Sequence, residues 1–296
     1  VAVSAGYYLM AKLQMRQLAE FSSQELFDLN HIDVKDGLIR LGHMPRSRLY
    51  VWKDPQQNHD IVVFIGEAQP PTGKYLFCRK LIDFTRELGV EKFFTFAAMT
   101  TDMHPEHEAR VYGAATDKGT LEQLQRLGLQ MVQGGQISGL NGVLLGAASE
   151  QGLPGACLLG EMPHIFSQLP FPKASMAVLK VFAAMAHIKL DLSELAEQAQ
   201  QMEKELGGLL AQIEKAVGQQ QQGQPNGPPW PAKPEGVAEE KKQPGIIAKQ
   251  RQHIESLFAQ ASQDRSKAYE LKATLDRLKV FEEYEDRFLD LFQKPD

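Results

Sequence analysis

Short runs of apolar residues, closed by glycine, proline or charged residues, recur through the first two thirds of the chain. Such runs, bounded by turn residues, are typical of strands that are buried on both faces. The pattern therefore predicts strands over LIRL, RLYVW and IVVFI within residues 38–65, KFFTFAAM at 92–99, VYGAAT at 111–116, and ACLLGEMP at 156–163.

Segments with apolar residues at helical spacing surround these strands. Predicted helices cover residues 2–20, 75–88, 117–126, the stretch after the glycines of 134–142, and 174–188. Strands that alternate with helices at this spacing indicate a mostly parallel sheet with helices on both faces. The predicted fold class is α/β.

The pattern changes after Leu190, where apolar residues repeat in alternating steps of three and four. This repeat is a heptad seam made of Leu192, Leu195, Ala199, Met202, Leu206, Leu209 and Ile213. A second charged helical region runs from about residue 246 to 292, and its apolar stripe contains Leu271, Leu275, Leu278, Phe281 and Phe288. Both regions together favour an antiparallel helical hairpin. Separate helices packed on the α/β body are the alternative.

A segment of different composition lies between the two helical regions. Residues 218–244 are rich in Gln, Pro and Gly, which predicts a flexible linker. We therefore predict an α/β domain over 1–190, an amphipathic helix over 191–217, the linker over 218–244, and a C-terminal helical region over 245–296.

Charge and cysteine content restrict the class of protein. Hydrophobic residues make up 43% of the 296 positions, and the formal net charge is −5. The chain has no excess of basic residues that would indicate a nucleic-acid partner. It also has no apolar run long enough to cross a membrane. Cys78 and Cys157 lie inside apolar segments, as buried reduced thiols do. The chain shows no secretory pattern at its start, and we expect a cytoplasmic protein.

Two predicted strands end in the same way, with a glycine followed by a glutamate. FIGEAQP places Glu67 after Gly66, and LLGEMP places Glu161 after Gly160. Ligands of open α/β sheets bind beyond the carboxyl ends of the strands, so the two acids are candidates for one crevice. Paired carboxylates can serve acid–base catalysis, but acids at strand ends also bind loop amides. We favour a structural or binding role.

A glycine-rich turn, GGQISGLNG at 134–142, precedes an apolar helix and is the third candidate part of the crevice. Its amides could face an anion at the helix N-terminus. It lacks the Lys-Ser/Thr ending of a phosphate loop and the spacing of a dinucleotide site, so a tightly packed turn is the preferred interpretation. The candidate ligand-binding residues here are Gly134, Gly135, Ser138, Gly139 and Asn141.

No motif indicates a metal, a cofactor or a catalytic residue. HPEHE at 104–108 only loosely resembles a metal site, because Pro105 interrupts any helical arrangement of its ligands. Neither cysteine lies in a motif typical of a catalytic nucleophile. The position of Ser138 in a glycine-rich turn is only weak evidence that it is a nucleophile. We expect no bound metal and no cofactor.

The order of segments carries a family resemblance. VAVSAGYYL, DIVVFIGEAQP, FFTFAAM, VYGAATD, GGQISGLNGVLLGAA and CLLGEMP, followed by the LDLSELAEQA helix, together resemble the proteasome-assembly-chaperone family of the second type over residues 1 to about 200. The resemblance implies an α/β sandwich shaped like nucleoside phosphorylases and hydrolases. Members usually begin with a strand and a Pro-Gly turn before the Val-Ala helix, so an open sheet edge or an incomplete crevice is expected for this sequence.

The resemblance also implies a function. Its well-understood members are oligomeric chaperones that hold proteasome subunits, so we expect a non-enzymatic, homo-oligomeric scaffold with a protein partner such as a proteasome-like subunit. Some archaeal relatives dock on the proteasome ring through a tail of hydrophobic-Tyr-any residue, whereas the given sequence ends in FQKPD, so we do not expect that docking mode. Some members carry an ATP-grasp ligase label, which no phosphate loop supports here. The alternative is a hydrolase, phosphorylase-like enzyme or ligase that uses the crevice.

Overall fold

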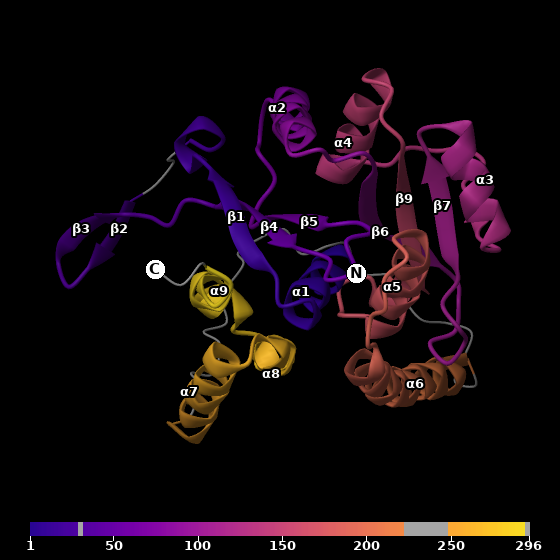
Figure 1. Cartoon of the computed structure of the whole chain (residues 1–296). Helices are drawn as coiled ribbons and strands as arrows, with labels where there is room; N and C mark the ends of the chain where they lie inside the picture. The colour runs from indigo at the N-terminus through magenta and orange to yellow at the C-terminus, as the bar shows by residue number, and fades with distance from the viewer. Residues whose placement is uncertain (29–31, 222–247, 294–296) are drawn as a thin grey trace.

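The computed structural model describes residues 1–28, 32–221 and 248–293 and shows helices on both faces of two small sheets (Figure 1). The first sheet contains β1 (Arg16–Phe21), β4 (Ser47–Trp52) and β5 (Ile61–Gly66), in the order β1-β4-β5. Both of its pairings are antiparallel. The predicted strands RLYVW and IVVFI are confirmed.

The predicted helix over residues 2–20 is wrong in its second half. Helix α1 spans Ala2–Lys12, and the chain then enters strand β1. Gln14 has a φ of 49°, and the amide of Met15 bonds back to the carbonyl of Met10. This left-handed residue with its backward hydrogen bond is a common way to end a helix.

The second sheet is formed by β6 (Phe93–Thr101), β7 (Val111–Ala115), β8 (Gln130–Met131) and β9 (Gly155–Pro163). Its order is β6-β9-β7-β8, with helix α3 (Lys118–Arg126) connecting β7 to β8. β6–β9 and β7–β8 are parallel, whereas β7–β9 is antiparallel.

The prediction of a mostly parallel sheet holds only in the second sheet, where two of the three pairings are parallel. Among the six strand pairings in the described residues, four are antiparallel. The physical reason lies in the connections, because a parallel pair needs a long crossover, usually a helix. β4 reaches β5 through a turn at 53–60, and β6 reaches β7 through a helix-free loop at 102–110.

Helices α2 (Lys74–Glu87) and α4 (Gly139–Glu150) cover one face, and α1 and α5 (Pro172–Met185) cover the other (Figure 1). Alternate residues of β9 explain this sandwich. Ala156 and Leu158 join the core under α1 and α5, while Cys157 and Leu159 join the core under α2 and α4. Both cysteines are free and buried, and burial raises the pKa of Cys78 to about 11.

The two sheets are not joined by a strand pairing in the described residues. Strands β5 and β6 each leave one edge unpaired, and a cleft of about 1240 Å³ is lined by residues of both strands together with α1, α2 and α4.

The helices after residue 190 pack on the α/β body. Helix α6 (Ser193–Gln221) packs along α5. α7 (Ala248–Gln263), α8 (Ala268–Arg277) and α9 (Phe281–Asp290) pack on one another, and α8 also packs on α1. The predicted hairpin between α6 and the C-terminal helices is not formed in the described residues, which adopt the alternative arrangement.

Several sequence predictions fall partly outside the described residues. Helix α6 reaches Gln221, four residues into the predicted linker, and residues 222–247 are not described. The side chain of Ile213 is also outside the described part. No helix that the structure describes combines the length and the apolar character needed to span a bilayer.

A small hairpin projects away from this body (Figure 1). It consists of β2 (Ile32–Lys35) and β3 (Leu38–Leu41), which pair antiparallel, so the predicted strand LIRL is confirmed.

Two leucines of α6 provide a test of its packing. Leu206 is 3% exposed and packs with Met162, Phe166 and Phe171, whereas Leu209 is 42% exposed. Leu206→Ala should lower the free energy of unfolding by about 2–5 kcal/mol, because it leaves a cavity in a packed core. Leu209→Ala is the matched control and should change it by less than about 0.5 kcal/mol in denaturant titrations. Equal effects would contradict the packing of α6 on the body.

Candidate functional site

Glu161 lies near the end of β9, where the neighbouring strands bring polar groups around its carboxylate. Antiparallel pairing sets Val111 of β7 opposite Gly160, which places Arg110 beside Glu161. The amide of Glu161 donates to the carbonyl of Arg110 at 2.9 Å. Parallel pairing with β6 brings the end of that strand, with Thr101, to the other side. The Glu161 side chain is only 1% exposed.

Four groups donate to this buried carboxylate. Arg110 Nε and Nη2 lie 2.8 and 2.5 Å from the two oxygens, and the Arg110 amide donates at 3.2 Å. The Thr101 hydroxyl donates at 2.8 Å, and the Tyr112 hydroxyl at 3.4 Å. The Arg110 hydrogen bonds, reinforced by Thr101, lower the pKa of Glu161 to about 2 despite its burial. Glu161 is therefore ionised, and both of its carboxylate oxygens already accept hydrogen bonds from neighbouring residues.

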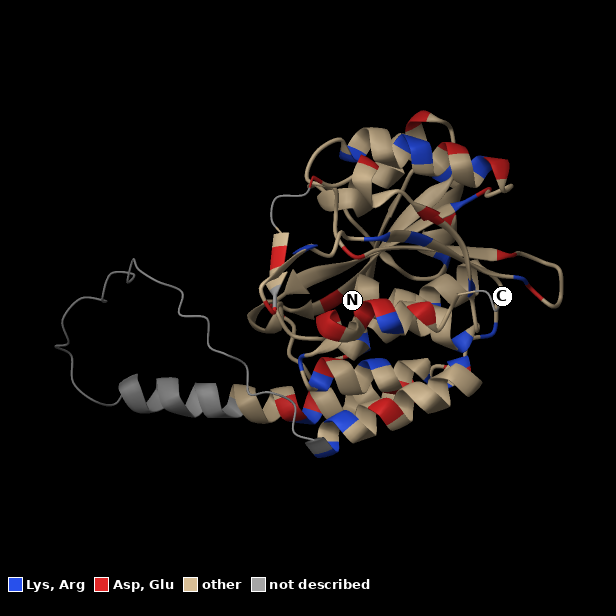
Figure 2. Cartoon of the chain, turned by 90° about the vertical axis from the view of Figure 1, so that its left-hand side faces the viewer, with Lys and Arg blue, Asp and Glu red and all other residues tan. Residues whose placement is uncertain are grey.

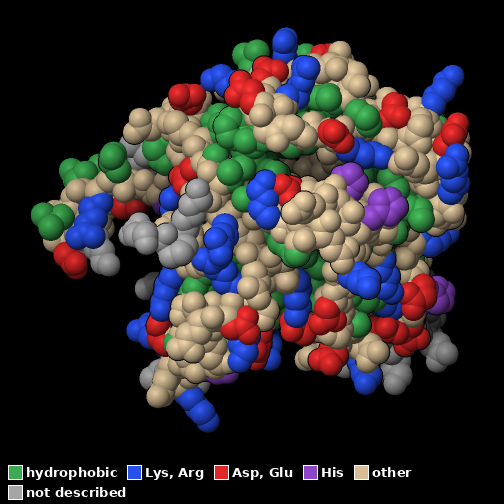
Figure 3. Space-filling view, viewed as in Figure 1, with side chains coloured by type: hydrophobic (Ala, Val, Ile, Leu, Met, Phe, Trp, Pro, Cys, Tyr) green, Lys and Arg blue, Asp and Glu red, His purple; other side chains and the backbone are tan. Residues whose placement is uncertain are grey.

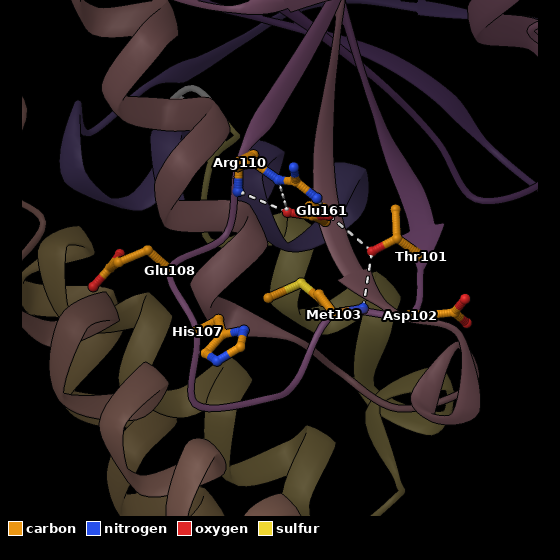
Figure 4. A pocket seen from close by; sticks show the side chains of 7 residues that line it. All are labelled: Thr101, Asp102, Met103, His107, Glu108, Arg110 and Glu161. Carbon is orange, nitrogen blue, oxygen red and sulfur yellow. Dashed lines mark hydrogen bonds and ion pairs between the residues drawn. The ribbon is translucent and has the colours of Figure 1, made fainter.

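An open hollow of about 530 Å³ surrounds this ion pair (Figure 4). Figure 4 shows Arg110, Glu161 and Thr101 linked together, while Asp102 and Glu108 point away from them. The Met103 amide donates to the Thr101 hydroxyl at 3.2 Å, which ties the 102–110 loop to the end of β6. The hollow thus contains one closed network, with no second acid directed at Glu161.

The loop that carries HPEHE is held by a buried lysine. Lys173 of α5 donates to the carbonyls of Pro105 and His107 at 2.8 and 3.0 Å, and its ammonium lies 2.8 Å from Glu203 of α6. A buried ammonium needs such partners, because an unpaired charge in an apolar environment is costly. The loop is positioned by its backbone carbonyls.

Glu67 occupies a different environment at the end of β5. Its side chain is 6% exposed, and Oε2 accepts from the Arg46 amide and contacts His43 Nε2, both at 2.8 Å. The guanidinium of Arg48, which is 1% exposed, lies 3.8 Å from Oε1 and also donates to Asp286 of α9 at 3.1 Å. Glu67 therefore belongs to an ion cluster that joins the first sheet to α9.

His43, Glu67 and Asp286 are close enough to be considered as metal ligands. However, His43 faces Glu67 with Nε2 and Asp286 with Nδ1, at 2.8 and 3.2 Å. Each ring nitrogen thus contacts a different carboxylate, so the imidazole bridges the two acids. Two guanidinium groups, those of Arg46 and Arg48, also contact Asp286. The geometry fits an ion-pair cluster better than a metal site.

The glycine-rich turn is closed by its neighbours. The Gln69 side chain accepts from the Leu140 amide at 3.1 Å, which occupies the N-terminus of α4. Asn141 Nδ2 donates to the carbonyl of Phe96 at 2.7 Å. A Cβ atom at Gly142 would lie 1.8 Å from the carbonyl oxygen of Ile137, so only glycine fits there. These contacts support the packed-turn interpretation.

Comparison with known protein families matches residues 1–210 to the PAC2 family. The chain belongs to the PAC2 family. A curated relative, the uncharacterized protein MJ1210 of Methanocaldococcus jannaschii, is 30% identical over 161 residues, which are 53% of this chain and 60% of that protein. The chain thus spans less than two thirds of that relative.

Solved PAC2-type structures have the same fold. The proteasome-assembly chaperone homologue Rv2125 of Mycobacterium tuberculosis has a TM-score of 0.59 at 25% identity, covering 69% of this chain and 86% of the other. The archaeal proteasome activator PbaB of Pyrococcus furiosus has a TM-score of 0.57 at 25% identity, covering 71% and 87%. A PAC2 family protein of Streptomyces avermitilis has a TM-score of 0.61 at 24% identity, and the match covers 70% of this chain and 88% of that protein.

The PAC2 domain does not bring the two predicted acids into contact. Glu67 and Glu161 share no hydrogen-bonding partner, and only Glu161 lines the hollow at the end of β9. Of the glycine-rich turn, Asn141 lines the cleft between β5 and β6. Gly134, Gly135 and Ser138 line neither opening, and Gly139 packs on Gln69.

Sequence reasoning missed the basic partners of both acids. Arg48 interrupts the apolar strand SRLYVW, and a charge within a buried strand indicates a buried ion pair. Arg110, directly before VYGAA, carried no comparable signal. Asp286 is separated from Glu67 by more than two hundred positions, and nothing in the sequence pattern connects them.

The stability of the PAC2 domain should depend on pH through Glu161. Its pKa is about 2 in the folded chain against about 4.5 when unfolded, so its contribution is present above about pH 4.5 and is lost as the pH falls towards 2. At pH 7, Glu161→Gln should lower the free energy of unfolding by about 2–3 kcal/mol, and this difference should shrink in denaturant titrations at low pH. A difference that is the same at pH 7 and pH 2.5 would contradict the assigned ion pair.

Proposed function

We propose that this chain is a non-enzymatic scaffold or assembly chaperone that acts through protein–protein contacts, with a proteasome-like subunit as its partner. Membership of the PAC2 family supports this proposal. So do the 25% identical structures, one described as a proteasome-assembly chaperone homologue and the other as an archaeal proteasome activator.

The observation that carries the proposal is the engagement of both candidate acids by arginines. A general base must accept a proton from substrate near neutral pH, and a carboxylate with a pKa of about 2 that is bonded to Arg110 is a poor base. Glu67 is likewise buried against Arg48 and His43. A proton-accepting role for Glu161 would break its hydrogen bonds to Arg110, and one for Glu67 Oε2 would break its contacts with His43 and the Arg46 amide.

The surface near the hollow supports binding of a protein partner. Ile165 and Leu169, which directly follow β9, are 49% and 41% exposed. Phe166 between them is buried in the same small core as Leu206 of α6, so these exposed side chains stand on a rigid base. Exposed apolar side chains on a rigid support are typical of protein contact surfaces.

A binding experiment tests the partner class. The tagged chain should capture proteasome-type subunits from the cells that produce it, identified by mass spectrometry. The double variant Ile165→Asp, Leu169→Asp should reduce this capture at least about tenfold, because it places charges in an apolar contact. The double variant Lys53→Asp, Asp60→Lys, at an exposed ion pair on the 53–60 turn, is the control. Absence of such subunits from the wild-type capture would overturn the proposal.

Glu67→Gln distinguishes the scaffold from an enzyme. If Glu67 is structural, the change should lower the free energy of unfolding by about 1–3 kcal/mol, because it weakens buried charge-assisted contacts. Glu108→Gln, at an exposed position, should change it by less than about 0.5 kcal/mol.

The same proteins should be screened against nucleosides, phosphoesters and amides, with and without divalent metal. The scaffold proposal expects no turnover by the wild type. Turnover that disappears in both Glu67→Gln and Glu161→Gln would establish the alternative, an enzyme that uses the strand-end acids.

A further inference from the structure

Three buried polar side chains meet where the first sheet lies against α9. Arg48 and Tyr50 are alternate residues of β4, so their side chains share one face of the sheet. Ile65 of β5 pairs with Arg48, and Glu67 follows two positions later on the same face. The side chains of the two charged residues and the whole of Tyr50 are at most 6% exposed. Phe292, just after α9, packs on the ring of Tyr50.

Each of these three side chains has one polar atom without a hydrogen-bonding partner among the residues that the structure describes. The atoms are Nη1 of Arg48, the hydroxyl of Tyr50 and Oε1 of Glu67. Nη1 and Oε1 lie 3.8 Å apart, which is too long for a direct hydrogen bond. The Tyr50 hydroxyl is close enough to the guanidinium to interact with its charge, but it makes no hydrogen bond to it. Buried polar atoms are rarely left unpaired, so the three atoms indicate a bridging group.

Both charged side chains are held in place by other partners. Nη2 of Arg48 donates to Asp286 of α9 at 3.1 Å. Oε2 of Glu67 accepts from the Arg46 amide and contacts His43, both at 2.8 Å. A shift that brought Nη1 onto Oε1 would stretch these contacts. The surrounding ion cluster therefore maintains the separation between the two atoms.

The three atoms require a ligand that both accepts and donates hydrogen bonds. The Arg48 guanidinium and the Tyr50 hydroxyl donate, since burial raises the pKa of Tyr50 and the hydroxyl keeps its proton. A bound cation would face the guanidinium, and a bound anion would face the carboxylate of Glu67. Charged side chains of both signs are also interspersed over the faces in Figure 2 and Figure 3, so no field of one sign favours an ion. A buried water typically makes about three hydrogen bonds to groups of this kind.

We propose that one water molecule is bound between β4, the end of β5 and α9. It accepts hydrogen bonds from Arg48 Nη1 and the Tyr50 hydroxyl, and it donates one to Glu67 Oε1. The water completes the ion cluster that joins the first sheet to α9. Glu161 obtains its donors from the chain itself, whereas Glu67 needs the water for its second oxygen. The two Gly-Glu strand ends thus satisfy their buried carboxylates by different means.

A high-resolution crystal structure of the full chain tests the site directly. We expect one peak of electron density within hydrogen-bonding distance of Arg48 Nη1, the Tyr50 hydroxyl and Glu67 Oε1. A direct hydrogen bond between Arg48 Nη1 and Glu67 Oε1 without such a peak would overturn the proposal. Crystals soaked in sodium bromide distinguish water from an anion. An anomalous bromide signal at this position would also overturn it.

A double-mutant cycle supplies an independent readout in solution. Tyr50→Phe removes the hydroxyl and keeps the ring, and Glu67→Gln changes the acceptor on the other side of the water. If one water links them, their combined effect on the unfolding equilibrium constant should differ from the product of the single effects by at least about threefold. Tyr50→Phe with Glu161→Gln, in the second sheet, is the matched control and should agree with the product within about twofold. Independent effects in both cycles would contradict a shared water. The measurement uses the purified chain alone, so its outcome is separate from that of the partner capture.

Discussion

The burial of α1 is the interaction on which the arrangement of the whole chain depends. The two sheets share no strand pairing in the described residues, so hydrogen bonds of a common sheet do not hold them together. Every residue of α1 from Ala5 to Ala11 is buried, and the helix packs on β5 and β6 at once. A helix that is apolar all round is stable only when it is surrounded. At Gly6 a Cβ atom would lie 2.8 Å from Cδ1 of Ile65, so the absence of a side chain lets the helix approach β5 without displacing Ile65.

Two strands end in the same Gly-Glu sequence, and in both cases the acid is neutralised by an arginine near a strand pairing. Glu161 meets Arg110 next to the β7–β9 pairing, and Glu67 meets Arg48 across β4–β5. Ionised groups buried at this depth persist only when they are paired and hydrogen-bonded. The sequence similarity of the two ends therefore reflects a shared requirement for charge pairing, and it does not make them halves of one catalytic site.

Sequence patterns predicted the strands well, because a short apolar run that ends at turn residues is too short for a buried helix and fits a buried strand. The strand-end positions of the two acids were predicted for the same reason. The pattern failed where one segment fits two periodicities, as at RQLAEF, which continues the helical spacing of α1 but pairs as β1. Strand direction and the partners of Glu67 depend on contacts between distant residues such as Asp286, which local periodicity does not encode.

The C-terminal helices lie beyond the residues that match the PAC2 family, yet they share the core of the matched domain. The Tyr7 hydroxyl donates to Glu285 at 2.5 Å, and the Gln17 amide donates to the carbonyl of Phe292 at 2.7 Å. Phe288 is fully buried against Tyr7. Since α1 holds the two sheets together, the helices that cover α1 contribute to the same cooperative unit. The end of the family match is therefore a boundary of sequence similarity, while the folded unit continues through α9.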